Sequence, residues 1–442
     1  MKRAFAAAAA AATERSKRAR VLPRQEPVHA FDESFITLDV LFGHVLSRLS
    51  ISHLRAWSVT CRYMAQEWPS AIVSAPVLRS HDKLPSFVVN AVPRMRNVKH
   101  IFDFTFVSYY LRKLPESAPV TAISTRGTTG FDEWPWPLAV RAPHLERLDI
   151  WFDAPHERRN PGHFTGLTAL RELRIRQDRD TVDGDSIITQ LGGMPQLTKL
   201  VLDQHKRTTD VALQHLTGLR ELRIIHECGI TDIGLMACAQ TLTCLELKGG
   251  EGWRFTAAGI NALTNLRTLK IAALGWRPPA LGDAIGHLTS LRALELHHTS
   301  CLGNPSGLSF LSCLANSLES FTLGYEFTLD TARDVATLTR LKELRLVDYP
   351  TAVNARLAKL SARRREEMYV NEHLAQASSS IEALVLKGDC ATLAHLSNIV
   401  RLTQLHTLRI EDCESSKAAH FGTYKELVQT LPRLTVYTTK WD

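Results

Sequence analysis

The sequence predicts an α/β fold in which short strands and helices alternate along a curved solenoid. A six-residue template, Leu-x-x-Leu-x-Leu or Ile in its usual form, recurs eleven times, starting at residues 145, 170, 197, 219, 242, 266, 291, 318, 341, 381 and 405. Successive copies are 22 to 27 residues apart, except for one interval of 40. A regular period of this length is typical of repeat arrays, in which no unit buries its apolar face without its neighbours.

Each repeat contains two segments with different apolar periods. The alternating leucines of the template indicate a short strand, and the following stretch has the spacing of a helix, as in residues 210–219 and 331–341. Parallel strands would form the concave side of a horseshoe, with the bulkier helices on its convex side. These are the features of a leucine-rich-repeat domain, which we assign to residues 95–442.

The array is expected to extend beyond the eleven clear copies. Degenerate copies lie near residues 98–101 and 120–123, and a closing copy lies at Leu434. The exposed ends of such a stack need caps, which a helical segment at 71–94 and the segment 421–442 could provide. The long interval holds an extra polar segment within residues 351–380, which we interpret as a helix that is either a solvated decoration or a partner-binding protrusion.

The charge and the cysteines exclude several function classes. The chain has a formal charge of +8, but residues 1–30 hold seven bases and two acids, which leaves only +3 on the other 412 residues. This is no footprint for a polyanion, so a nucleic-acid partner is not expected. The eight cysteines form no CxxC pair, and we interpret them as small buried side chains in a reducing compartment, either cytoplasmic or nuclear. No apolar run is long enough to cross a membrane.

The first thirty residues combine an alanine run with the basic cluster SKRAR at 16–20. A disordered leader is favoured by the low complexity and the high charge. A bipartite nuclear-import signal is an alternative, because Lys2-Arg3 and the cluster at 17–20 are separated by thirteen residues. A secretory or mitochondrial presequence ranks last, because the apolar part is almost pure alanine.

Two amphipathic helices are predicted within residues 35–70. One apolar stripe runs from Leu38 to Leu49 and a second from Leu54 to Trp68, with a break at 50–52. The string LDVLFGHVLSRLSISHLRAWSVTCRYMAQEW over 38–68 resembles an F-box, with VLSRLS, Leu54 and TCRYM as its best-matching parts. The alternative from the pattern alone is a helical cap on the solenoid.

The repeats add to this resemblance. The segment LRELRIIHECGITDIGL over residues 219–235 is similar to the cysteine-containing repeat that is common in F-box receptors. The resemblance implies a non-catalytic substrate-recognition subunit of a cullin-RING ubiquitin ligase of the SCF type, which binds a Skp-type adaptor and an unknown target protein. The adaptor-binding residues that it implies are Leu38, Leu41, Val45, Leu46, Leu49, Leu54, Cys61 and Met64. A stand-alone protein-binding scaffold is the alternative function.

Template positions three, five and seven should project from the concave side of the sheet. Position three reads Arg147, Glu172, Lys199 and Glu221 in successive repeats, and position five reads Arg223, Glu246, Lys270 and Glu295 over the next four. Opposite charges on neighbouring strands can pair, so much of this charge is expected to be satisfied internally. The groups that escape the alternation are predicted to bind a partner: Trp151, Phe152, Arg174, Arg176, Ile225, His226, His297, His298, Tyr325 and Arg345.

No motif of a known catalytic site is present. The sequence lacks GxxxxGK[ST], GxGxxG after a strand, HExxH and GxSxG. His297 and His298 with Cys301 make only part of a metal-ligand set. We therefore expect neither catalysis, nor a cofactor, nor a metal in this chain.

Overall fold

The computed structural model divides the chain into two compact units, Met1–Leu49 and Ser50–Asp442. The residues it describes all lie in the second unit: 93, 98–102, 107–126, 138–152, 166–177, 185, 188–189, 196–204, 208–226, 228–249, 252–273, 280–297, 308–324, 329–347, 380–387, 399, 401–411 and 427–439. The predictions for the tail, for the F-box-like segment, for 71–94 apart from Pro93, and for most of 351–380 therefore lie outside the described residues.

The described strands form one parallel sheet of fourteen strands, which follow each other in sequence order. Their bounds are β1 (His100–Phe102), β2 (Ala122–Arg126), β3 (Arg147–Phe152), β4 (Glu172–Gln177), β5 (Lys199–Asp203), β6 (Glu221–Ile225), β7 (Cys244–Gly249), β8 (Thr268–Ala273), β9 (Ala293–Leu296), β10 (Ser320–Gly324), β11 (Glu343–Val347), β12 (Ala383–Lys387), β13 (Thr407–Glu411) and β14 (Thr435–Thr439). The eleven clear copies, the two degenerate copies and the closing copy are thereby confirmed as strands. The leucine-rich-repeat solenoid predicted from the sequence is what the sheet shows.

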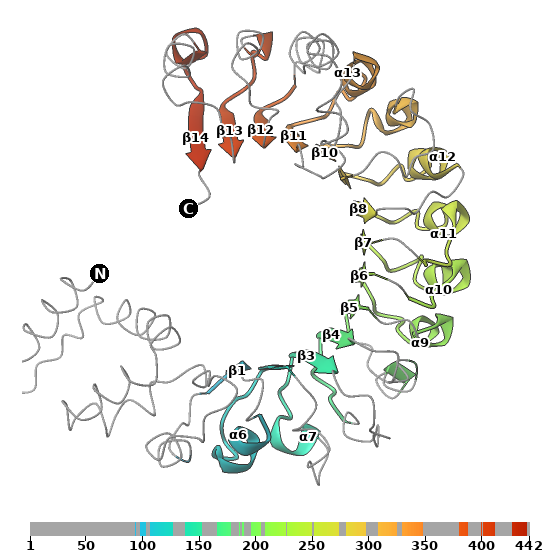
Figure 1. Ribbon diagram of the computed structural model, residues 1–442, viewed down its shortest axis with the longest axis vertical. Coiled ribbons are helices and arrows are strands. Elements are labelled where there is room, and N and C mark those ends of the chain that lie inside the picture. Colours follow the sequence, from blue (N-terminus) through green and yellow to red (C-terminus); the bar gives the residue numbers. More distant parts are fainter. Residues whose placement is uncertain are drawn as a thin grey trace, which may run out of the picture. The chain divides into compact units, whose positions relative to one another are not determined.

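Helices occupy the other layer of this unit, on the convex side of the curved sheet (Figure 1). They are α6 (Val107–Lys113), α7 (Leu138–Arg141), α9 (Asp210–Gln214), α10 (Asp232–Ala237), α11 (Ala257–Asn261), α12 (Leu281–Gly286), the 3-10 helix η4 (Ser309–Leu314) and α13 (Leu329–Ala336). The helices expected over 210–219 and 331–341 are shorter than predicted. The chain must turn back toward the sheet within one period, so tight turns follow each helix, as where the Leu216 N–H donates to the Leu213 carbonyl.

The core lies between the two layers. All three apolar positions of all eleven templates are buried, and the helices add a second set of buried side chains, such as Leu213, Leu235 and Ile260. In the sheet, equivalent positions face each other directly, as for Leu222, Leu245 and Leu269 on β6, β7 and β8. The template therefore specifies both the strand and its register.

Acidic residues connect the helical ends of neighbouring repeats. Asp210 begins α9, and its two carboxylate oxygens accept hydrogen bonds from the Thr231 N–H at 2.7 Å, the Thr231 hydroxyl at 2.6 Å and the Gly234 N–H at 3.0 Å. Thr231 is in turn the N-cap of α10. One carboxylate thus satisfies donors at the start of the next helix, which have no partner inside that helix.

The same arrangement recurs one repeat later and one repeat earlier. Asp232 accepts hydrogen bonds from the Thr256 N–H, the Thr256 hydroxyl and the Gly259 N–H of the α11 unit. Asp185 likewise accepts from the N–H and the hydroxyl of Thr209. The Asp–Thr–Gly ladder is our name for Asp185, Asp210 and Asp232 together with the threonines and glycines that donate hydrogen bonds to them. It ties four successive repeats together on their helical side.

The long interval does not interrupt the sheet. β11 pairs with β12 in parallel, with Leu344 opposite Leu384, although about forty residues separate the two strands. The extra segment within 351–380 therefore leaves the strand stack in register. Its helix prediction lies outside the described residues.

The cysteine prediction is confirmed only in part. Cys228 and Cys238 are buried free thiols, and burial raises their pKa to about 12 and about 11. Cys244 is half-buried, and Cys313 is exposed on η4, so the expectation of burial is wrong for Cys313. Among the described residues, no helix has the length and apolarity that crossing a membrane requires.

Candidate functional site

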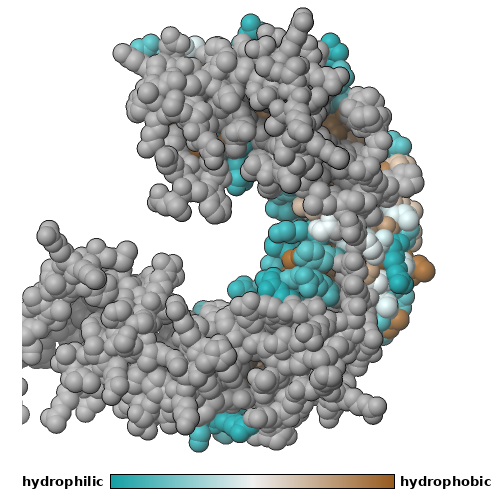
Figure 2. All heavy atoms as spheres, viewed as in Figure 1, coloured by the Kyte–Doolittle hydropathy of each residue, from teal (hydrophilic) through white to brown (hydrophobic). Residues whose placement is uncertain are grey.

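The concave surface is made by the side chains at template positions three, five and seven of β3 to β9. Figure 2 shows that the described part of this inner side is predominantly hydrophilic. Strands of a parallel sheet lie about 4.8 Å apart, so equivalent side chains on neighbouring strands are within reach of each other. The geometry therefore places charged groups of successive repeats side by side.

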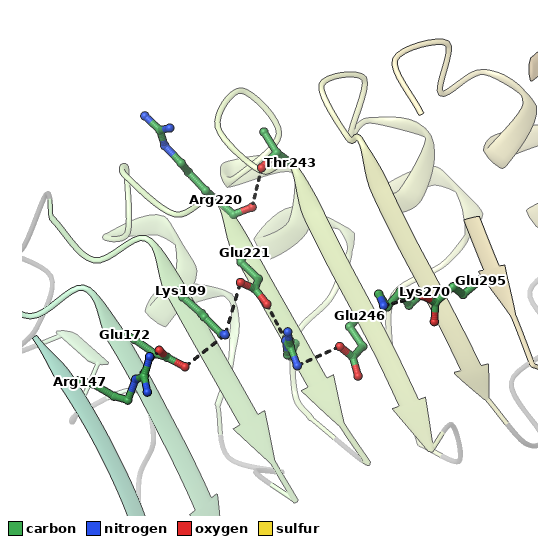
Figure 3. Close-up of polar contacts among 10 residues, drawn as sticks. Arg147, Glu172, Lys199, Arg220, Glu221, Thr243, Glu246, Lys270 and Glu295 are labelled. Carbon is green, nitrogen blue, oxygen red and sulfur yellow. Dashed lines mark hydrogen bonds and ion pairs between the residues drawn. The ribbon is translucent and has the colours of Figure 1, made fainter. Parts of the chain in front are cut away.

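An ion-pair ladder runs across the start of this surface. Arg147 Nε lies 2.7 Å from Glu172 Oε2, and Lys199 Nζ lies 3.2 Å from Glu172 Oε1 and 3.5 Å from Glu221 Oε2. Each of these charges comes from a different strand, from β3 through β6 (Figure 3). The prediction that alternating charges at position three are satisfied internally is confirmed here.

The ladder then moves to position five. Arg223 Nε lies 2.6 Å from Glu221 Oε1, and its Nη1 lies 3.3 Å from Glu246 Oε2 on β7. Further along, Lys270 Nζ on β8 lies 2.5 Å from Glu295 Oε1 on β9. Figure 3 shows Lys270 and Glu295 directed toward one another from neighbouring strands. The ladder therefore holds its side chains in fixed positions before any partner arrives.

Three arginines that were expected to escape pairing do not escape it. Arg174 Nη2 and Arg176 Nε lie 3.3 Å and 2.7 Å from Oδ2 of Asp203, a carboxylate on β5 whose side chain is only 8% exposed. Arg345 Nη2 on β11 lies 2.8 Å from Glu411 Oε2 on β13. The prediction that these arginines stand outside the internal charge network is wrong. Whether they also bind a partner stays a prediction.

The polar network near β3 and β4 is partly desolvated. The Ser124 hydroxyl donates a hydrogen bond to Asp149 Oδ2 at 3.3 Å, and burial raises the pKa of Asp149 in spite of the nearby Arg174 charge. Arg174 Nε is buried without a hydrogen-bond partner among the described residues. This end of the concave surface therefore holds a polar group, Arg174 Nε, that no described residue satisfies.

At the other end, His297 and Lys270 act on one carboxylate. His297 Nε2 lies 3.5 Å from Glu295 Oε2, and the hydrogen bond from His297, followed by that from Lys270, holds the pKa of Glu295 at about 2. His297 was predicted to stand free of the charge alternation, and this is also wrong. Because the folded-state pKa lies below the ordinary value of 4.5, the stabilisation is present above that value and is lost as the pH falls through about 2.

The remaining predicted residues differ in their surroundings. Ile225 is half-exposed at position seven of β6. His226 is exposed and follows β6 in the left-handed region, with φ of 67°; its N–H donates to the Lys248 carbonyl and its carbonyl accepts from the Trp253 indole at 2.5 Å. Trp151 and Phe152 lie in β3, but their side chains, like His298, Tyr325 and all eight adaptor-binding residues, lie outside the described residues.

Two exposed groups were missed by the sequence reasoning. Lys248 lies at position seven of β7, directly opposite Ile225 in the sheet, and is exposed. Arg409 on β13 lies over the Tyr437 ring of β14, with its guanidinium carbon 5.7 Å from the ring centroid. The signal was available for both, because counting to positions five and seven of the template places them on the concave side.

The concave surface presents charges of both signs that pair with each other. Exposed ion pairs contribute little to stability, but fixed complementary charges favour a matching surface over a mismatched one. Among the described residues, no group of three or more His, Cys, Asp or Glu side chains could hold a metal ion. The described part of the concave surface is thus a polar face that includes the half-exposed Ile225 beside the exposed Lys248.

The sheet and this face define the chain as a leucine-rich-repeat solenoid. A comparison with family models finds no match, and neither does a comparison with curated proteins. Among solved structures, it is similar to an internalin (inlF) from Listeria monocytogenes str. 4b F2365, with 14% identity over 85% of this chain and 89% of that chain and a TM-score of 0.37.

Two further solved structures are similar. One is TLR13 in a complex with ssRNA13, with 15% identity over 85% of this chain and 55% of that chain and a TM-score of 0.43. The other is the Toll–Spatzle complex of Drosophila, with 12% identity over 76% of this chain and 49% of that chain and a TM-score of 0.38. This chain spans about half the length of these two. The assignment of the fold rests on its own period and sheet.

Proposed function

We propose that this chain is a non-catalytic repeat scaffold that holds a protein partner on its concave surface. The observation that carries the proposal is the ion-pair ladder, which spans successive strands and keeps charged side chains in fixed register. Binding to such a face costs little side-chain ordering, because the side chains are ordered beforehand. The half-exposed Ile225 next to Lys248 supplies an apolar contact within the polar face.

The balance of charges favours a protein over a polyanion. At positions three, five and seven of β3 to β9, the residues include seven bases and six acids, which gives a formal charge of +1. A polyanion requires a continuous basic stripe, which this surface lacks. A protein surface with both signs of charge matches it better.

A paired substitution tests the concave surface. Ile225→Asp with Lys248→Glu should reduce binding of the proteins that co-purify with the full-length chain by about tenfold, since it removes an apolar contact and reverses an adjacent charge. The measurement is quantitative mass spectrometry of proteins captured with each variant, after circular dichroism has shown that both variants fold.

A matched control changes the convex side by the same charge. Ile233→Asp with Arg333→Glu alters two exposed residues of α10 and α13. Partners that bind the concave surface should be retained by this variant. Equal loss from both variants, or retention by both, would count against the proposed surface.

We further propose that residues 38–68 connect this scaffold to a Skp-type adaptor and thereby to a cullin ligase. The F-box resemblance of that segment and its place before the repeats support the proposal. Catalysis would then be supplied by other subunits, which transfer ubiquitin to a target that this chain holds nearby.

The adaptor proposal predicts a direct interaction. Val45→Asp with Leu49→Asp should reduce affinity for a purified Skp-type adaptor by at least about a hundredfold, because two charges enter the apolar stripe. His44→Asp with Gln66→Asp adds the same charge outside the best-matching parts of the segment and should change the affinity little. If the unsubstituted chain does not bind the adaptor in a pull-down or by calorimetry, the stand-alone scaffold is the better reading.

A further inference from the structure

A polar groove lies along the edge of the sheet where β7 to β11 begin. It encloses about 480 Å³ and is lined by Gln240, Thr243, Asn265, Arg267, Thr289, Ser290, Arg292, Asn316, Ser317, Glu319 and Arg340. These residues precede the strands and belong to the turns between helix and strand. The groove is therefore distinct from the concave surface, and the inference drawn from it does not depend on the concave surface binding anything.

The floor of the groove has a fixed spacing. The residues at template position two are joined across the repeats by backbone hydrogen bonds, since the Arg292 N–H donates to the Arg267 carbonyl at 2.9 Å and the Glu319 N–H donates to the Arg292 carbonyl at 2.8 Å. The Arg267 N–H donates in the same way to Thr243. Their side chains therefore leave the sheet at intervals of one strand, about 4.8 Å.

The groove carries an excess of positive charge. Arg267 is exposed and has no hydrogen bond or ion pair from its side chain to another described residue. Arg292 is 62% exposed and lies 3.6 Å from Glu319, which Lys342 also approaches, at 3.7 Å. The Arg340 guanidinium donates a hydrogen bond to the carbonyl of Asn316 at 3.3 Å. The lining thus holds three bases, Arg267, Arg292 and Arg340, and one acid, Glu319. Exposed ion pairs such as that of Arg292 with Glu319 are easily exchanged for a ligand.

We propose that this groove binds an extended acidic peptide segment of a protein partner. Carboxylate or phosphate groups of the peptide would pair with the guanidinium groups of Arg267, Arg292 and Arg340, which suit oxyanions because they donate two parallel hydrogen bonds. The hydroxyl and amide side chains between them, such as Ser290 and Asn265, would bond to the peptide backbone. The line of the groove across successive strands matches a ligand that is itself extended.

The lining favours a peptide over a nucleic acid. Its described residues include no aromatic side chain, so bases have no surface on which to stack. Glu319 lies in the middle of the row, where a continuous phosphate backbone would meet a carboxylate. A peptide can place a neutral residue at that point.

Fluorescence anisotropy with the full-length chain tests the proposal. The probes are short labelled peptides of alternating glycine and glutamate, the same peptide with phosphoserine or with glutamine in place of glutamate, and an oligothymidine of equal length. We expect the two acidic peptides to bind, with an affinity that falls as salt is added, and the glutamine peptide not to bind. Arg267→Ala with Arg292→Ala should weaken the acidic peptides about tenfold.

The control removes two arginines elsewhere. Arg171→Ala with Arg333→Ala removes the same charge, and Arg171 occupies the same template position outside the groove. Both variants keep the basic residues of the first thirty positions, so any binding of the peptides to those residues is the same in both. An affinity change below about twofold in the control, with the tenfold loss in the groove variant, supports the proposal. The proposal is overturned if both variants lose affinity equally or if neither acidic peptide binds. It is also overturned if oligothymidine binds as tightly as the acidic peptides and loses as much affinity in the Arg267→Ala, Arg292→Ala variant.

Discussion

Leu245→Ala should lower the free energy of unfolding by about 3 kcal/mol, because Leu245 is fully buried in β7 and the smaller side chain leaves a cavity in the core. Leu222 and Leu269 flank it on the adjacent strands and would both lose packing contacts. In a repeat array the damage lies between neighbouring units, so it should weaken the coupling of the whole stack. Urea unfolding followed by circular dichroism measures the change.

Glu246→Ala is the matched control for this substitution. Glu246 is the next residue along the same strand, and its side chain lies on the opposite face, where it pairs with Arg223 at 3.3 Å. Arg223 keeps its second partner, Glu221, so the cost should stay below about 1 kcal/mol. A larger loss of unfolding free energy from Glu246→Ala than from Leu245→Ala would mean that Glu246, and not Leu245, faces the core. Hydrogen exchange of the β6 and β8 amides would show whether the damage spreads to the neighbours.

The fold was predictable because the sequence of each repeat specifies the register of its own strand. Leu245 and Leu247 alternate with Glu246, and the alternation can be satisfied only if the leucines face the helices. The period then fixes where the next strand starts, which is why the degenerate copies before 145 could be found. The helix lengths were overestimated, since the apolar residues at Leu216 and Leu219 continue the helical spacing although the chain has already turned.

The concave surface was predicted less completely than the fold. Pairing between adjacent strands follows from the template, and the position-three row illustrates it. Arg345, however, reaches Glu411 two strands away, across β12, where position five is the buried apolar Val385. Arg176 reaches Asp203 on the next strand at the same template position. A comparison of charges at positions three and five only misses Asp203, which lies at position seven. A comparison of adjacent repeats only misses the contact that Arg345 makes two strands away.

The edge groove could not be predicted from the sequence, because its residues lie outside the apolar positions of the template. Its arginines occupy the variable second position or the turn before it, where the sequence shows no period. Only the register of the strands brings Arg267 and Arg292 side by side. The strings TTDVAL, ITDIGL and FTAAGI share the threonine of the Asp–Thr–Gly ladder, but they do not reveal that the acid of one repeat accepts hydrogen bonds from the threonine of the next.

Asp210→Ala should destabilise the repeats by about 2 to 4 kcal/mol. The substitution removes the acceptor of three hydrogen bonds and leaves the Thr231 and Gly234 N–H groups at the start of α10 without a partner in a half-buried place. Asp330→Ala is the control, because Asp330 also lies in the first turn of a helix but is 62% exposed, and among the described residues its ion pair is with Arg333. Its loss should cost less than about 1 kcal/mol, which is the general effect of an acid at a helix start.

The glycine at position 234 makes this prediction sharper. A Cβ at Gly234 would lie 2.4 Å from Asp210 Oδ1, and the same is true of Gly259 and Asp232 Oδ1 one repeat later. Neither glycine has a positive φ, so backbone conformation does not require glycine at these positions. Glycine is needed because the carboxylate lies so close to the backbone. Gly234→Ala alone should therefore be destabilising, as the added methyl displaces the carboxylate from its donors.

A double-mutant cycle separates this cause from the ordinary effects of replacing a glycine. In the Asp210→Ala background the carboxylate is gone, so the penalty of Gly234→Ala should fall by at least half. Urea unfolding of the four proteins gives the coupling energy. Gly286→Ala is the control in the same cycle, because Gly286 is a helical glycine of α12 outside the ladder and, like Gly234, has no positive φ. Equal penalties for Gly234→Ala in both backgrounds would show that the glycine is required for another reason, and that the carboxylate does not hold the two helices together.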